Sequence, residues 1–168
     1  MVMADVFTVV FSVVAILMAV PAYWLMSRAL FPRVAIQSRA RFTDTPLRLL
    51  PLGLIVGSIL VTPALVLVNL PYGPAKVIGV WMLAGSVALA LSGAGGLATR
   101  IGDSISPEDS AANRTLKGGL ALELACLLPV LGWFIIPTLV LIAGFGAATL
   151  ALVKPLEAGP VRVLAEAA

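Results

Sequence analysis

Few side chains in this sequence could do chemistry, and the most isolated of them is a carboxylate. Glu123 is the only charged residue between Gly118 and Val153. A carboxylate in an apolar membrane segment is costly to bury, and it often marks a proton path or an ion site. Glu123 also follows Lys117 by only six residues, so it could face lipid head groups at the membrane surface. The lack of a charged partner in the other apolar segments favours the surface interpretation, and the sequence leaves both open.

Other residue types that support catalysis or cofactor binding are scarce. The chain has no histidine, which is the usual axial ligand of haem and the commonest ligand of transition metals. Its one cysteine, Cys126, lies in an apolar segment and has no second thiol to pair with. The glycine-rich run 92–96 lacks the Lys-Ser/Thr pair of a phosphate-binding loop. We therefore expect no catalytic residues, no metal site and no cofactor, and we expect that the protein is not an enzyme.

The composition of the chain is that of a membrane protein. Of its 168 residues, 61% are hydrophobic and 11% are charged, against about 25% charged residues in soluble domains. The apolar residues fall in blocks long enough to cross a hydrocarbon layer of about 30 Å as helices. The sequence therefore predicts an all-α polytopic integral membrane protein, a single domain over 1–168 with about four transmembrane helices. The predicted spans are 6–27, 49–71, 77–99 and 130–153.

The last apolar block, 118–153, is predicted to be bent or interrupted. Its 36 residues would measure about 54 Å as one straight helix, which is too long for a single crossing. Pro129, Gly132 and Pro137 mark the break. One interpretation is a surface helix over about 107–128, followed by the fourth span. The alternative is a helical hairpin that dips into the membrane and returns to the same side.

Two capping signals indicate where helices begin. Asp44-Thr45-Pro46 places a capping side chain before a proline, at the start of the second span. Ser106-Pro107-Glu108-Asp109 repeats this pattern and adds acids that complement the dipole of a helix. The surface helix is therefore predicted to begin with Ser106 as its N-cap.

Basic residues indicate the orientation. The connection 28–48 holds five of them and the connection 100–117 holds three, whereas four crossings would leave Lys76, Lys154 and Arg162 on the other side. Positive charge accumulates on the cytoplasmic side, so we expect both connections to be cytoplasmic in a bacterial inner membrane. The hairpin alternative would bring the C-terminal tail to that side too. Because the basic residues follow the membrane boundaries, we expect no nucleic-acid partner.

Aromatic residues with a polar edge lie mostly near the ends of the predicted spans. Tyrosine and tryptophan concentrate at the two membrane surfaces, where the ring is partly apolar and partly hydrated. This pattern predicts an aromatic belt formed by Tyr23, Trp24, Tyr72, Trp81 and Trp133.

Small residues recur four positions apart within the spans. Residues with this spacing lie on one face of a helix, and small side chains let two helix backbones approach closely in lipid. Several pairs on three spans predict close helix packing, within the chain or against a partner. The pairs are Gly53 and Gly57, Ala84 and Ala88, Ser92 and Gly96, and Gly144 and Ala148.

Two short patterns resemble those of a known group of bacterial proteins. Residues 126–133 read Cys-Leu-Leu-Pro-Val-Leu-Gly-Trp, and residues 144–147 read Gly-Phe-Gly-Ala. Together with Pro46-Leu47-Arg48 before Gly53, they resemble the membrane-spanning segments that accompany bactofilin-type, polymer-forming cytoskeletal domains. The resemblance implies a helical membrane fold over the last three spans and implies no activity. The chain has no β-helical polymerising domain.

These observations favour a non-enzymatic role. We expect an accessory or scaffold subunit of a larger bacterial membrane complex, for which a respiratory or photosynthetic assembly is one candidate. Its partners would be other membrane protein subunits and lipids. The alternative is a small homo-oligomeric transporter or channel, in which Glu123 and the broken fourth helix line a path.

Overall fold

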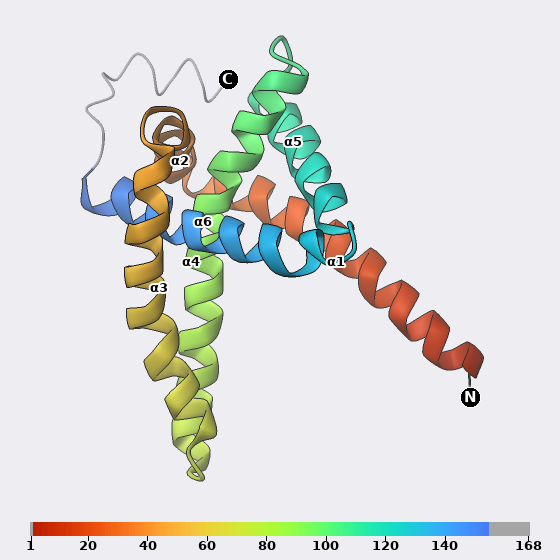
Figure 1. The fold of residues 1–168 in the computed structure, drawn as a ribbon, viewed down its shortest axis with the longest axis vertical. Helices are drawn as coiled ribbons and strands as arrows, with labels where there is room; N and C mark the ends of the chain where they lie inside the picture. The colour runs from red at the N-terminus through yellow and green to blue at the C-terminus, as the bar shows by residue number, and fades with distance from the viewer. Residues whose placement is uncertain (1, 155–168) are drawn as a thin grey trace.

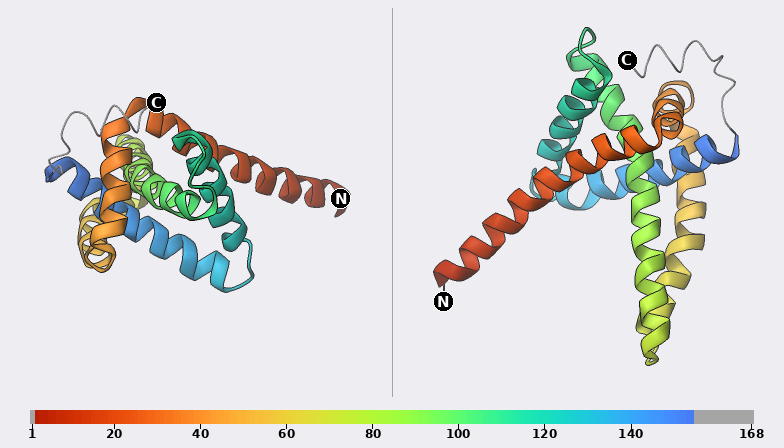
Figure 2. Two further views of the ribbon diagram at one scale, coloured as in Figure 1. Left: turned by 90° about the horizontal axis from the view of Figure 1, so that it is seen from above. Right: turned by 180° about the vertical axis from the view of Figure 1, so that it is seen from behind.

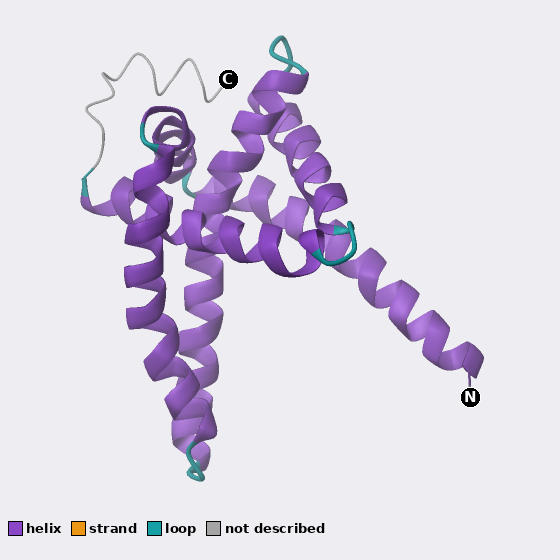
Figure 3. Cartoon of the chain, in the orientation of Figure 1, coloured by secondary structure: helices purple, strands orange, loops and turns teal. Residues whose placement is uncertain are grey.

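The computed structural model describes residues 2–154, and every regular element in that range is a helix (Figures 1 and 3). The elements are α1 (Val2–Leu30), α2 (Pro32–Asp44), α3 (Pro46–Asn69), α4 (Gly73–Ile105), α5 (Ala111–Cys126), η1 (Leu131–Ile135) and α6 (Ile136–Val153). Element η1 is a single π-helical turn that leads directly into α6. The predicted all-α fold is confirmed for the described residues.

Four stretches of helix are long and apolar enough to cross a membrane. They are Asp5–Leu30, Pro46–Asn69, Gly73–Ile105 and Leu131–Val153. In two of them a charged residue lies at each end of the apolar part. The helix from Asp5 to Arg28 and the helix from Lys76 to Arg100 each measure roughly 35 Å. Large apolar side chains such as Phe11 and Trp81 are exposed, as expected for a surface that faces hydrocarbon. The protein is therefore a polytopic membrane protein.

Two connections differ from the expectation. The connection 28–48 contains α2, which packs on α4 and α6. The surface helix expected from about 107 begins at Ala111, and Ser110 is its N-cap, whose hydroxyl accepts from the backbone N–H of Asn113 at 3.3 Å. Ser106 does not have the predicted capping role, because α4 continues to Ile105 and the N–H of Ser106 closes its last turn.

Helix α6 crosses the antiparallel pair formed by α3 and α4, and the three helices do not run side by side (Figures 1 and 2). The far ends of α3 and α4 project beyond α6, and α1 diverges from them in another direction (Figure 1). The contacts of α6 lie near the start of α3 and the middle of α4. A Cβ on Gly53 would overlap the carbonyl of Ile142, and a Cβ on Gly93 would overlap that of Gly144. The crossing therefore depends on backbones that touch.

The chain reverses direction between α5 and α6. Helix α5 packs back along α4, and the guanidinium of Arg41 on α2 donates to the carbonyl of Lys154 at the end of α6. The end of α6 thus lies at the same end of the molecule as α2. This contact favours the hairpin alternative for the last apolar block, and the sidedness of Lys154 stays a prediction.

The reversal is built around one strained residue and one glycine. Val130 has φ 66°, an unusual conformation for a β-branched residue. Position 132 requires glycine, because a Cβ there would lie 2.5 Å from the carbonyl oxygens of Ala125 and Cys126. Backbone N–H groups around the turn still find partners, as for Leu128 with Ala125 and Gly132 with Leu128. Such internal bonding is what an irregular segment needs in apolar surroundings.

The α3–α6 crossing predicts that Gly53→Ala destabilises the fold. The added methyl group would collide with the backbone of α6, and such overpacking costs about 1–3 kcal/mol. Gly85→Ala is the matched control, because apart from its chain neighbours and the adjoining backbone of its own helix, no atom lies within 4 Å of the position that its Cβ would take. Thermal unfolding in detergent should show a lower Tm for Gly53→Ala alone. Equal Tm values for the two variants would contradict the crossing.

The hairpin alternative makes a second prediction, on topology. In a background with Cys126→Ala, single cysteines at Arg33 and Lys154 should react with a membrane-impermeant thiol reagent from the same side. A cysteine at Lys76, in the first turn of α4, should react from the other side. All three positions are exposed in the structure. Labelling of position 154 together with position 76 would show that α6 crosses the membrane fully.

Candidate functional site: a charged end and a buried carboxylate

One end of the molecule carries most of its charge. Nine basic and four acidic residues lie on α2, on the helix ends beside it and on the 106–110 turn; they are Arg28, Arg33, Arg39, Arg41, Arg48, Arg100, Arg114, Lys117, Lys154, Asp44, Asp103, Glu108 and Asp109. The other charged residues of the described part are Asp5, Lys76 and Glu123. The two basic connections therefore lie together in space.

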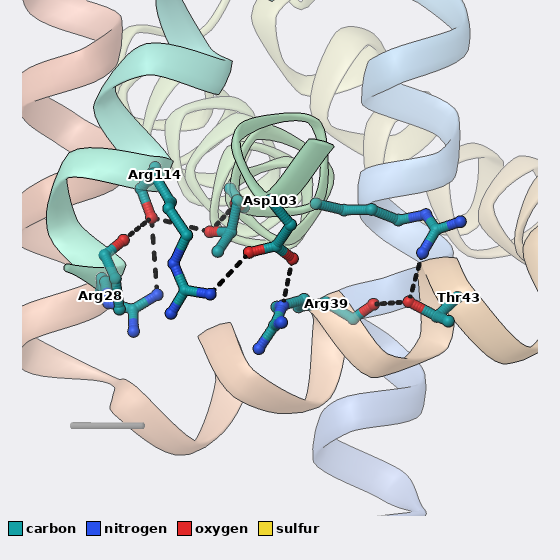
Figure 4. Close-up of polar contacts among 10 residues, drawn as sticks. Arg28, Arg39, Thr43, Asp103 and Arg114 are labelled. Carbon is teal, nitrogen blue, oxygen red and sulfur yellow. Dashed lines mark hydrogen bonds and ion pairs between the residues drawn. The ribbon is translucent and has the colours of Figure 1, made fainter. Parts of the chain in front are cut away.

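Asp103 joins three helices at this charged end (Figure 4). Its carboxylate accepts from Nε of Arg39 on α2 at 2.6 Å and from Nη1 of Arg114 on α5 at 3.0 Å. The three side chains are only 18–27% exposed. Gly102, the neighbour of Asp103, lets α4 and α5 touch, since a Cβ there would overlap the carbonyl of Arg114. The ion pairs thus form where the backbones are already close.

A second set of polar contacts lies beside Asp103. The hydroxyls of Thr99 on α4 and Thr115 on α5 are 2.8 Å apart and buried. Arg28, at the end of α1, donates to the hydroxyl of Thr115 at 3.5 Å (Figure 4). Arg100 donates to Thr43 on α2 at 2.8 Å. Helices α1, α2, α4 and α5 are therefore held together at the charged end by side-chain bonds.

Helix α1 is anchored to α4 by two aromatic residues. Trp24 donates from Nε1 to the carbonyl of Leu91 at 3.0 Å, and its ring is 3% exposed. The hydroxyl of Tyr23 donates to the carbonyl of Ala88 at 2.7 Å and lies 2.9 Å from the hydroxyl of Ser92. Both rings take part in helix contacts, and Trp24 is buried there, so its ring does not face lipid head groups as a belt residue would. The side chains of Tyr72, Trp81 and Trp133 are exposed, so the structure leaves the aromatic-belt prediction open for them.

The buried carboxylate is Glu123, in the last two turns of α5. The residue is 8% exposed, and neither carboxylate oxygen has a hydrogen-bond partner. It lies eight residues beyond Thr115, roughly 12 Å along the helix from the charged end. This position and burial differ from those of a residue facing head groups. Glu123 is therefore an unpaired acidic group within the apolar part of the molecule.

A cavity of about 510 Å³ adjoins Glu123 between α1, α4 and the α5–α6 reversal. Its wall is apolar except for Glu123 and the thiol of Cys126; the lining residues are Val13, Ile16, Leu17, Val20, Trp24, Leu91, Leu122, Glu123, Cys126, Leu127, Gly132, Trp133, Pro137, Val140 and Leu141. Ligand cavities commonly measure about 300–1,000 Å³ and combine apolar walls with a few polar groups. The size and lining of this cavity suit a small ligand.

The small residues singled out in the sequence lie at several different contacts. Gly53 faces the backbone of α6, and a Cβ on Gly57 would lie 3.2 Å from the ring of Phe145. Gly96 faces the backbone of Ser38 on α2, and Gly144 faces Ala90 on α4. Ala148 is fully buried, and Ser92 bonds to Tyr23. The sequence did not indicate α2 as the partner of Gly96.

The sequence also left two groups of residues unrecognised. Asp103 was not singled out, because its partners Arg39 and Arg114 do not lie three or four residues from it in the sequence. The cavity gave no signal, because its walls come from four helices. Within residues 2–154, no three His, Cys, Asp or Glu residues are grouped so as to hold a metal ion.

Comparisons with models of known protein families, with curated proteins and with solved structures gave no match. The resemblance to membrane segments of bactofilin-type proteins therefore stays a prediction.

The Asp103 network predicts that Asp103→Asn destabilises the protein. The substitution keeps the shape but removes the charge that two arginines share, leaving them to repel each other. We expect a loss of about 1–3 kcal/mol, since the partners are part-exposed. Asp44→Asn is the control, because Asp44 is exposed at the end of α2. Denaturant or thermal unfolding in detergent checks this, and equal stability of both variants would exclude a structural role for Asp103.

Proposed function

We propose that this protein is a non-enzymatic accessory or scaffold subunit of a larger complex in a bacterial inner membrane. The observation that carries the proposal is the isolation of α1. Only 6% of its most apolar stretch is buried, whereas 39% of the corresponding stretch around α6 is buried. Side chains such as Val6, Phe7 and Phe11 are more than half exposed. Because α1 makes few contacts with the rest of the chain along this stretch, its apolar surface is open to a helix of another protein.

The divergence of the spans supports a protein partner beside lipid. Helix α1 and the α3–α4 pair separate from each other beyond α6 (Figure 1). The charged end, in contrast, is fixed by the Asp103 network and by the anchoring of Trp24. A rigid base with diverging apolar helices suits a scaffold, because a helix from a partner subunit can lie between them. Membrane helices associate by such packing, without a hydrophobic driving force.

The basic end gives the proposed orientation. Cytoplasmic loops of bacterial membrane proteins carry the excess of Lys and Arg. With connections 28–48 and 100–117 at one end of the fold, this rule puts both in the cytoplasm. A respiratory or photosynthetic assembly is one candidate host.

A transporter or channel built from several copies of the chain is the second candidate. The observation that favours it is the unpaired carboxylate of Glu123 beside the cavity. Intramembrane acids of this kind often belong to transport paths. The described residues contain one such acid, so several copies would be needed to build a continuous path.

The subunit proposal predicts that α1 contacts unlike proteins. A photo-crosslinking amino acid at Phe11, 69% exposed, should link the chain to a specific membrane protein in intact cells. The same amino acid at Glu108, exposed in the turn before α5, is the control and should not. Mass spectrometry of the chain purified in mild detergent would identify the partner. Crosslinks only to copies of this chain would favour the second candidate, and lipid adducts alone would contradict both.

A further inference from the structure

We infer that the cavity beside Glu123 binds a lipophilic organic cation, meaning a molecule with one positive charge and a largely apolar body. The inference rests on the side chains of the cavity and does not depend on the proposed partner. A carboxylate that is 92% buried lines a space large enough for a small molecule, and both of its oxygens lack a partner. The remaining walls offer apolar contact.

The charge of Glu123 selects a cation. Burying an ionised carboxylate without a partner is costly, and a cation that enters the cavity offsets this cost. Of the described residues that line the cavity, no other is acidic or basic. Trp24 and Trp133 also line it, and the faces of tryptophan rings attract cations. The ring of Trp24 is held in place by its bond to Leu91.

The apolar walls exclude most other ligands. Inorganic divalent cations prefer six or more oxygen ligands, and this cavity presents one carboxylate. Anions would meet the charge of Glu123. A neutral apolar molecule would gain contact with the walls but would leave the carboxylate unpaired. A molecule that is both cationic and apolar pairs with the carboxylate and contacts the apolar walls.

The position of the cavity indicates entry from the lipid. Leu127 and Trp133, at its rim in the α5–α6 reversal, are 44% and 67% exposed. On the other side, Ile16 of α1 is 62% exposed. These residues belong to the apolar surface of the molecule, so a ligand that partitions into the bilayer would reach Glu123 without crossing the charged end.

The test uses tetraphenylphosphonium as the probe and the full chain in nanodiscs of zwitterionic lipid. Equilibrium dialysis should show saturable binding at one site per chain. Glu123→Gln should weaken binding about tenfold or more, because it removes the charge and keeps the shape. Glu108→Gln, a carboxylate exposed in the 106–110 turn, is the matched control and should bind like the parent. Tetraphenylborate, similar in shape but anionic, should show only unsaturable partition into lipid.

Two further measurements separate binding from misfolding. Ile16→Trp narrows the cavity from the lipid side and leaves Glu123 in place, so it should also weaken binding while the Tm stays unchanged. Acidification should weaken binding to the parent and not to Glu123→Gln, since protons compete with the cation for the carboxylate. Cys126 is the other titratable group of the wall, and a thiol is neutral at acid to neutral pH. Equal binding by the parent, Glu123→Gln and Ile16→Trp, or saturable binding of tetraphenylborate at the same site, would overturn the inference.

Discussion

Direct contact between helix backbones is the constraint on which the rest of this structure depends. In a bilayer, an apolar side chain gains little free energy when it moves from lipid into a contact between helices. Membrane helices therefore associate through close packing. At the crossing of α6 over α3 and α4, the residues in contact are glycines such as Gly53, Gly93 and Gly144. A steep crossing has a small contact area, and removing side chains from it lets many backbone atoms touch. The position of α6, and with it the course of the chain after α5, follows from these glycines.

Contacts at the charged end restrict helix movements that the crossing alone would allow. A crossing with a small contact area lets helices pivot, and the bonds from Asp103 to Arg39 and Arg114 fix α4 to α2 and α5 at a second point. The contact of Arg41 with the end of α6 adds a third. Side-chain ion pairs can do this here because the surroundings are partly apolar and the geometry is held by adjoining backbone contacts. The basic residues that orient a membrane protein thus also hold its helices together.

The sequence predicted the elements better than their arrangement. Apolar length and flanking charges located the spans, and Pro129 with Gly132 located the break, because these signals act within a few residues. The crossing, the role of α2 and the Ser110 cap depend on which backbones meet. A small-residue pair such as Gly53 and Gly57 indicates a contact but not the partner. Asp103 and Glu123 show the same limit, because the sequence does not tell which acid has partners on other helices. Asp103 bonds to arginines on two other helices, and the carboxylate of Glu123 has no partner.

The reversal and the cavity are parts of one feature. The break that ends α5 comes directly after the turn that carries Glu123, and it supplies Leu127, Gly132 and Trp133 to the cavity wall. A continuous helix over this block would carry Glu123 on one face and would not bring that wall opposite it. Neither the reversal nor the packing of α5 on α4 needs an acid at this position, since its carboxylate makes no bond. A buried acid that makes no bond within the fold and lines a cavity is the feature from which a bound cation is inferred.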